Sequence, residues 1–230
     1  MMVRVPMGSP LLGVNQLLAQ RNRAAFARSG ALVLNLMSSP GSGKTTILER
    51  TIEQLAGRVR LAVIEGDLYT DQDARRIEGK GAAVVQINTQ GACHLDADMV
   101  WEAWQQLAER QPQVLFIENV GNLVCPAEFD LGEAARVAVM SVTEGNDKPT
   151  KYPLLFRQAS VVLLNKVDLL GYTDFSLERF RDDVGRINPR ALVFELSART
   201  GEGLAPWCQW LEEQVLARSE EDELHGRAGP

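Results

Sequence analysis

Cysteine and histidine are scarce in this chain of 230 residues, which has three cysteines and two histidines. Three cysteines form no paired disulfide framework, so we expect a reducing, cytoplasmic location in which the thiols stay free. Neither residue type occurs in residues 1–30, so a histidine-rich or cysteine-rich metal store is not expected there.

The chain also lacks long apolar runs and a surplus of basic residues. No stretch is long enough to cross a bilayer, and the N-terminus has no signal-peptide core, so we expect no membrane partner. The net charge is −6 and no basic stripe is visible, which argues against nucleic acid as a partner.

A glycine-rich run, SSPGSGKT at residues 38–45, follows a strand-like apolar stretch. Gly41 and Gly43 allow the backbone to turn its N–H groups toward an anion, and Lys44 is placed to reach the β- and γ-phosphates of a nucleotide. The motif normally begins with glycine, whereas Ser38 stands there, so we expect the entry to the loop to differ in detail. The residues expected to bind nucleotide here are Gly41, Ser42, Gly43, Lys44, Thr45 and Thr46.

A second motif, NKVD at residues 165–168, follows another strand-like run. In GTPases the aspartate of this motif accepts hydrogen bonds from the guanine N1–H and 2-amino groups, a donor pair that adenine lacks. Ser197-Ala198-Arg199 matches the loop that closes over the guanine. The sequence therefore predicts a GTP site whose base is bound by Asn165, Lys166, Asp168, Ser197 and Ala198.

The run ENVG at residues 118–121 matches the GTPase motif D-x-x-G, with glutamate for aspartate. Glu118 can hold Mg²⁺, while Gly121 can reach the γ-phosphate. Thr45 supplies a hydroxyl for the same ion. Asp67 is a candidate Mg²⁺ ligand in the first switch, with the alternative that it caps the next helix.

The candidate catalytic groups are Lys44, Asp67, Asp73 and Glu118. Asp71 and Asp73 are candidates for positioning the attacking water. No catalytic glutamine is evident, so we expect slow hydrolysis unless dimerisation or a partner completes the site.

Seven short runs, most of them continuous in Val, Ile and Leu, alternate with helical segments, which is typical of strands covered on both faces. We predict an α/β, three-layer P-loop NTPase with a mostly parallel, doubly wound sheet of about seven strands. A helical extension is expected at 1–30, the GTPase domain at 31–217, and an acidic, disordered tail at 218–230. The runs are 31–37, 59–64, 82–87, 114–117, 136–142, 161–164 and 191–196.

Cys93, His94 and Cys125 form a candidate site for Zn²⁺ or Ni²⁺, because thiolates and imidazole suit both ions. Three ligands leave a position open, which suits an ion that is passed on or a site completed by a second subunit. Spacing alone leaves open the alternative that these residues form no metal site. In that case Cys93 would be buried, His94 would lie at the surface, and Cys125 would be unrelated to them. We interpret Cys208 as a core thiol, because it lies among tryptophans on a helical pattern.

Four segments, at 34–46, 65–67, 116–126 and 143–153, resemble the HypB family, GTPases that assist nickel insertion into nickel–iron hydrogenase. The resemblance extends over residues 14–216. It implies GTP or GDP, Mg²⁺, and Ni²⁺ or Zn²⁺ as cofactors. Many relatives carry an N-terminal Cys-rich or polyhistidine nickel segment, which is absent here, so high-capacity storage is not expected.

The resemblance also implies partners. The family belongs to the SIMIBI class of NTPases, which dimerise across their nucleotides, so a homodimer dependent on nucleotide or metal is expected. Cys93, His94 and Cys125 would then lie at the dimer interface. Lys148 would contact nucleotide or the opposing subunit, with a solvated surface lysine as the alternative. Another nickel-insertion accessory protein and the hydrogenase large subunit are the further partners implied.

Three other functions remain open at this point. A urease-type nickel GTPase is the nearest, although its metal motif is Cys-Pro-His, whereas Cys-His and Cys-Pro are separate here. A GTPase serving a cobalamin enzyme fits the three metal-ligand candidates poorly. A regulatory GTPase that does not deliver metal, with zinc as a structural clip, belongs to a different functional class.

Overall fold

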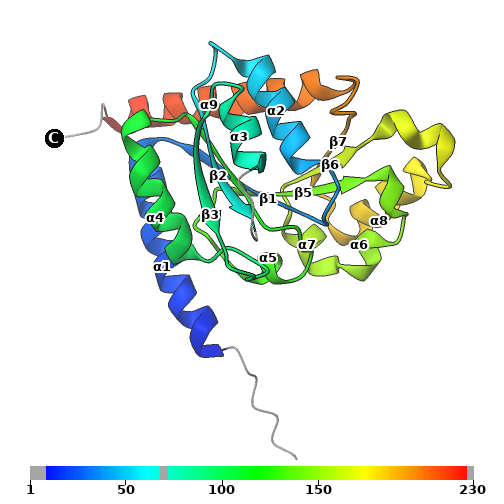
Figure 1. The fold of residues 1–230 in the computed structure, drawn as a ribbon, viewed down its shortest axis with the longest axis horizontal. Helices are drawn as coiled ribbons and strands as arrows, with labels where there is room; N and C mark the ends of the chain where they lie inside the picture. The colour runs from blue at the N-terminus through cyan, green and yellow to red at the C-terminus, as the bar shows by residue number, and fades with distance from the viewer. Residues whose placement is uncertain (1–8, 68–71, 227–230) are drawn as a thin grey trace, which may run out of the picture.

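The computed structural model describes residues 9–67 and 72–226, with side chains from 12 to 220 within these ranges. Its centre is a seven-stranded sheet in the order β3-β2-β4-β1-β5-β6-β7, and every adjacent pair is parallel. The predicted α/β fold with a doubly wound sheet is confirmed (Figure 1). The strands are β1 Leu32–Ser38, β2 Leu61–Asp67, β3 Ala83–Asn88, β4 Val114–Glu118, β5 Ala135–Ser141, β6 Val161–Asn165 and β7 Leu192–Glu195.

Helices cover both faces of the sheet, because alternate side chains of each central strand point to opposite faces. Leu34 and Leu36 of β1 pack in the core beneath α2, α3 and α9, whereas Val33 packs beneath α1 and α4. A third cluster, under α7 and α8, contains Met37 and Phe156. The helices are α1 Ser9–Ser29, α2 Lys44–Leu55, α3 Gln72–Glu78, α4 Ala97–Leu107, α5 Cys125–Glu128, α6 Lys148–Lys151, α7 Pro153–Gln158, α8 Leu177–Ile187 and α9 Leu204–Gly226, with 3-10 turns at Ala108–Arg110, Val142–Glu144 and Val167–Tyr172.

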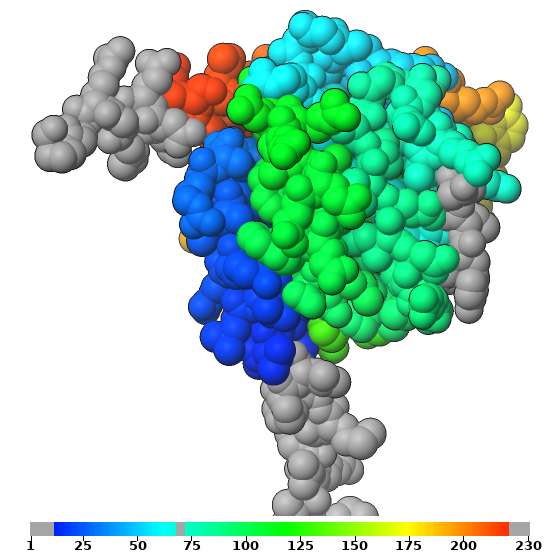
Figure 2. Space-filling view, turned by 60° about the vertical axis from the view of Figure 1, so that its left-hand side comes forward, coloured from blue at the N-terminus to red at the C-terminus, as the bar shows by residue number. Residues whose placement is uncertain are grey.

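The N-terminal helix α1 lies alongside α4 and is part of the main body of the protein (Figures 1 and 2). Phe26 meets Trp104 of α4 edge to face, with ring centroids 5.2 Å apart. Arg21 lies over the ring of Trp101 at 4.4 Å. The helix ends before Gly30, whose φ of 71° is in the left-handed region that favours glycine.

The C-terminal segment differs from the expected disordered tail. Helix α9 continues to Gly226, so residues 218–226 are helical rather than disordered. The segment is rich in glutamate and has no proline or glycine before Gly226, and extending an existing helix avoids the cost of nucleation. Residues 227–230 lie outside the described part of the chain.

No helix in the described ranges combines the length and apolar character that a bilayer crossing requires.

Candidate functional site

The predicted nucleotide motifs meet at one edge of the sheet, because the carboxyl ends of parallel strands lie together. The phosphate-binding loop follows β1, and the motifs at Glu118 and Asn165 end β4 and β6. A cavity of about 530 Å³ lies among them, lined by residues 40–46, 65–67 and 118–121 and by Asp73, Arg76 and Lys166. A depression of about 930 Å³ opens at the opposite strand ends and contains none of the motif residues.

The phosphate-binding loop depends on two glycines in left-handed conformations, Gly41 with φ 77° and Gly43 with φ 97°. A Cβ atom on Gly43 would lie 2.4 Å from Nδ2 of Asn165, so no side chain fits there. Lys44 is buried, and its ammonium donates to Oγ of Ser38 at 2.7 Å. Ser38 is extended in β1, so its backbone needs no glycine, and its hydroxyl holds Lys44 instead.

Thr45 and Glu118 lie together at the predicted Mg²⁺ site. The Thr45 hydroxyl is 2.8 Å from Oε1 of Glu118 and 3.1 Å from Oδ2 of Asp73. Oε2 of Glu118 is buried without a hydrogen-bond partner among the described residues. Burial raises the pKa of Glu118, against the opposing effects of Lys44 and Thr45. Asp67, at the end of β2, lines the same cavity, whereas Asp71 lies outside the described residues.

Glu65, which was not among the predicted site residues, lies opposite Glu118 in the register of β2 and β4. It is 2% exposed, and its Oε2 also has no partner in the described part of the chain. Burial, reinforced by Glu118, raises the pKa of Glu65 to about 8. Burial lowers the pKa of nearby Lys44. Two buried carboxylates with unpaired oxygens beside a hydroxyl are a donor set that fits a hard divalent cation such as Mg²⁺.

Arg76 was also missed, since only its place on α3 brings it to the cavity. Its guanidinium donates to Asp73 at 2.8 Å, to Glu49 at 2.7 Å and to the Thr46 hydroxyl at 3.4 Å. The structure therefore holds a cationic group beside Asp73, the candidate for positioning water.

The guanine motif is assembled around Asn165. Its Nδ2 donates to the carbonyl of Ser42 at 2.9 Å, and its Oδ1 accepts from the N–H of Ala198 at 3.0 Å. Asp168 accepts from the Ser197 hydroxyl at 2.6 Å. One amide thus connects the phosphate-binding loop with the loop expected over the base.

Lys166 has the left-handed φ of 64°, and its ammonium donates to the carbonyl of Gly41 at 2.7 Å. Lys148 is not brought to the cavity of the single chain. It begins α6, with its ammonium 5.6 Å from the ring centre of Tyr152.

Cys93, His94 and Cys125, the Cys–His–Cys triad, come together as predicted. All three ligand atoms lie within 4.8 Å of one another. Sγ of Cys93 is 3.0 Å from Sγ of Cys125 and 3.6 Å from Nδ1 of His94. Because metal bonds to sulfur and nitrogen are about 2.3 and 2.0 Å long, ligand atoms on one ion lie roughly 3.5 Å apart, so small shifts would accommodate Zn²⁺ or Ni²⁺.

The pKa values of His94 and Cys125 shift in opposite directions. Burial lowers the pKa of His94, which favours the neutral imidazole that ligates metals. The hydrogen bond that Cys125 shares with Cys93, together with burial, raises the pKa of Cys125. Metal binding must therefore displace a proton from this thiol. Cys208 is buried in the core as predicted, and burial raises its pKa to about 11.

Comparison with known proteins decides the family. A protein-family model described as "CobW/HypB/UreG, nucleotide-binding domain" matches residues 32–195 of the sequence. The hydrogenase maturation factor HypB of Azotobacter chroococcum mcd 1 is 55% identical over 208 residues, covering 90% of this chain and 68% of the relative. HypB of Escherichia coli (strain K12) is 53% identical over 207 residues, covering 90% and 71%. The chain belongs to the HypB family.

A solved HypB structure is also similar. The crystal structure of HypB from Helicobacter pylori in complex with nickel has a TM-score of 0.84 and 38% identity to this chain, covering 88% of this chain and 95% of that one. The resemblance stated from the motifs is confirmed by these comparisons, and the relatives named HypB favour this family over the urease-type alternative.

In this member of the HypB family, Asn119 connects two loops. One is the loop at residues 118–121, which lines the nucleotide cavity, and the other is the loop at residues 93–95, here called the triad loop. Its Oδ1 accepts from the N–H of Leu95 at 3.1 Å and from that of Val120 at 3.0 Å. Leu95 directly follows His94, and Val120 directly precedes Gly121. The contact with Leu95 joins residues 24 positions apart, so no sequence motif indicates this role of Asn119.

Backbone packing strengthens this connection. A Cβ on Gly66 would lie 2.9 Å from the side chain of Leu95, and a Cβ on Gly121 would lie 3.1 Å from Pro40 of the phosphate-binding loop. The strand end at Gly66 therefore packs against Leu95, and the loop at Gly121 packs against the phosphate-binding loop.

Proposed function

We propose that this chain is a GTP-hydrolysing metallochaperone that binds nickel or zinc at Cys93, His94 and Cys125 and assists nickel insertion into nickel–iron hydrogenase. The observation that carries the proposal is the proximity of a soft-donor triad to a GTPase-type cavity, with Asn119 hydrogen-bonded between them. The nickel complex of the related Helicobacter pylori HypB supports it.

The nucleotide would be held by the N–H groups of the phosphate-binding loop and by Lys44, and its guanine by Asp168. Thr45, Asp67 and Glu118 would hold Mg²⁺, which when bound neutralises charge on the β- and γ-phosphates. Asp73 would orient the attacking water. Without a glutamine in that role, the intrinsic rate would be slow.

Coupling would arise because Gly121 and Cys125 lie on one short loop. The presence of the γ-phosphate would move Cys125 relative to Cys93 and His94, and so change metal affinity. Bound metal would in turn change the affinity for nucleotide.

The active form would be a homodimer that depends on GTP and metal. Three ligands per chain leave a coordination position that a second copy could fill. Lys148, which lies away from the cavity of its own chain, would contact the opposing subunit. Delivery would involve another nickel-insertion accessory protein and the hydrogenase large subunit.

The proposal is tested by measuring Ni²⁺ and Zn²⁺ dissociation constants with GDP and with a non-hydrolysable GTP analogue. We expect different values in the two states, and equal values would remove the switch. Cys125→Ala should lower metal stoichiometry, whereas the matched control Cys208→Ala, which removes a core thiol, should not. A zinc ion held without exchange in both nucleotide states would instead favour the regulatory GTPase.

A further inference from the structure

We propose that Asn15 and Asn22 of α1 are positioning residues for the metal site, because they hold the triad loop of His94 against the segment that follows Cys125. The inference deepens the proposed function and rests on it. It assigns to the N-terminal helix a role in setting the geometry of ligands that it does not itself contact.

Both side-chain amides span the same two segments. Oδ1 of Asn15 accepts from the N–H of Ala97 at 2.8 Å, and its Nδ2 donates to the carbonyl of Asp130 at 2.8 Å. Nδ2 of Asn22 donates to the carbonyls of Ala97 at 2.7 Å and Leu131 at 3.0 Å. Ala97 lies just beyond His94 on one segment, and Asp130 and Leu131 lie just beyond Phe129 on the other.

These amides are buried, with Asn15 6% and Asn22 0% exposed. Burial makes each hydrogen bond costly to lose, because water cannot replace the missing partner. Loosening the helix would therefore leave backbone groups of both segments without partners.

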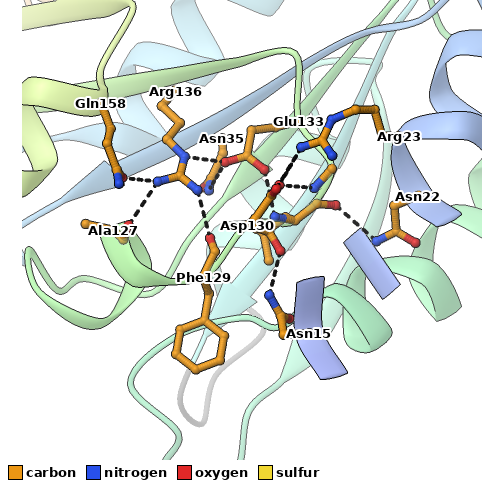
Figure 3. A network of polar contacts seen from close by, with 12 residues as sticks. Asn15, Asn22, Arg23, Asn35, Ala127, Phe129, Asp130, Glu133, Arg136 and Gln158 are labelled. Carbon is orange, nitrogen blue, oxygen red and sulfur yellow. Dashed lines mark hydrogen bonds and ion pairs between the residues drawn. The ribbon is translucent and has the colours of Figure 1, made fainter. Parts of the chain in front are cut away.

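The backbone of the second segment also packs directly against α1. Gly132 has φ 88°, and a Cβ there would lie 2.6 Å from the carbonyl oxygen of Ala19. Arg23 adds two contacts of 2.8 Å to the carboxylate of Asp130 (Figure 3). The segment therefore packs so closely against α1 at Gly132 that no side chain fits there.

The same segment reaches the triad through Phe129, whose ring lies on that of His94 with centroids 3.9 Å apart. Arg136 donates to the carbonyls of Ala127 at 2.9 Å and Phe129 at 3.2 Å (Figure 3). Glu133, in turn, holds Arg136 at 2.6 Å. The backbone that follows Cys125 is therefore held by Arg136 at Ala127 and Phe129 and by α1 at Asp130 and Leu131.

It follows that α1 sets the separation between Cys93 with His94 on one loop and Cys125 on the other. Preorganised ligands bind metal more tightly, and loss of residues that orient ligands commonly weakens metal affinity about 10- to 100-fold. We expect Asn15→Ala and Asn22→Ala to weaken Ni²⁺ binding by at least about 10-fold.

The experiment measures Ni²⁺ dissociation constants and the thiolate-to-nickel charge-transfer absorption of the full chain. Asn188→Ala is the matched control, because its Nδ2 donates to the carbonyls of Phe156, Arg157 and Ala159, all on α7 and the turn into β6. It should lower thermal stability without changing either metal measurement. If an alanine variant does not fold, the same measurements are made on Asn15→Asp. Aspartate keeps the oxygen that accepts from the N–H of Ala97 and keeps the packing.

A second measurement needs no metal. In a Cys208→Ala background, the rate at which diamide oxidises Cys93 and Cys125 to a disulfide reports how closely the two loops are held. We expect a slower rate in the Asn15 and Asn22 variants and an unchanged rate in Asn188→Ala. GDP affinity should remain unchanged in all of them.

The outcomes separate the two proposals. Wild-type metal affinity, charge-transfer absorption and oxidation rate in the Asn15 and Asn22 variants would overturn this inference while leaving the proposed function intact. Wild-type protein that binds neither ion through Cys93, His94 and Cys125 would overturn the proposed function and this inference with it.

Discussion

At the scale of single residues, the nucleotide cavity is notable for buried charge. Glu65 and Glu118 face each other across β2 and β4, beside a buried Lys44. Burial opposes ionisation of both carboxyls, and the charge of Glu118 adds to this effect at Glu65. A bound divalent cation would instead favour the ionised form of both carboxyls. The free energy gained from the ion is therefore greatest when both groups must be ionised.

This arrangement predicts a pH-dependent effect of Glu65→Gln on the free energy of unfolding, measured with chelator and without nucleotide. The pKa of Glu65 rises from 4.5 in the unfolded chain to about 8 in the folded one. Its stabilising contribution is therefore complete below pH 4.5 and is lost as the pH rises toward 8. Relative to wild type, Glu65→Gln should gain stability across this window, by a few kcal/mol in all, and change little above it.

Urea unfolding at a series of pH values checks this expectation. A difference between variant and wild type that is constant across the window would show that Glu65 is ionised in the folded protein and contradict the assignment.

At the scale of elements, Asn165 at the end of β6 holds two loops at once, one at Ser42 and one at Ala198. The close approach requires a glycine at position 43, where the missing Cβ leaves room for the amide. Gly41 has a similar left-handed φ but open space around its missing Cβ. Substitutions at Gly41 and Gly43 therefore distinguish the cost of backbone strain alone from the cost of strain together with a steric clash.

We expect Gly43→Ala to destabilise the nucleotide-free protein more than Gly41→Ala. Both substitutions place alanine at positive φ, which costs about 1–3 kcal/mol, but only the first adds a clash with Asn165. In an Asn165→Ala background the extra cost of Gly43→Ala should largely disappear, giving a coupling of about 1 kcal/mol or more in a double-mutant cycle. Unfolding free energies of wild type, the three single variants and the Gly43→Ala/Asn165→Ala double variant test this, and strictly additive effects would refute the clash.

At the scale of the whole molecule, the two candidate sites share a connected set of contacts. Asn119 lies between the loop at Gly121 and the triad loop at Leu95, and Gly66 packs against Leu95. On the far side of the triad loop, α1 bridges to the segment after Cys125. The nucleotide cavity, the Cys–His–Cys triad and α1 thus share overlapping backbone.

We predict reciprocal coupling that depends on Asn119. The factor by which a GTP analogue changes Ni²⁺ affinity should equal the factor by which Ni²⁺ changes analogue affinity, because linkage is symmetric. Asn119→Ala should bring both factors toward one. Titration calorimetry gives the factors, and light scattering on the same samples reports whether the dimer forms.

Unchanged factors in Asn119→Ala would show that coupling does not pass through this amide. Unequal factors at equilibrium would indicate a further linked process such as dimerisation, which the protein-concentration dependence of each factor identifies.

Much of this protein was determined by the sequence alone. Apolar runs, glycines at fixed spacing and motif residues at strand ends predicted the seven strands and the GTPase motifs, because local backbone chemistry depends on neighbouring residues. Spacing alone left the Cys–His–Cys triad open, and the resemblance to the HypB family favoured it. The disordered tail was the exception, since good helix-forming residues extend α9 to Gly226.

Only the tertiary structure decided which distant residues meet. Strand order and register place Glu65 against Glu118, α3 brings Arg76 to Asp73, and α1 bridges the segments on either side of the Cys–His–Cys triad. Such contacts depend on how elements pack, and packing is set by the whole core rather than by any short stretch of chain.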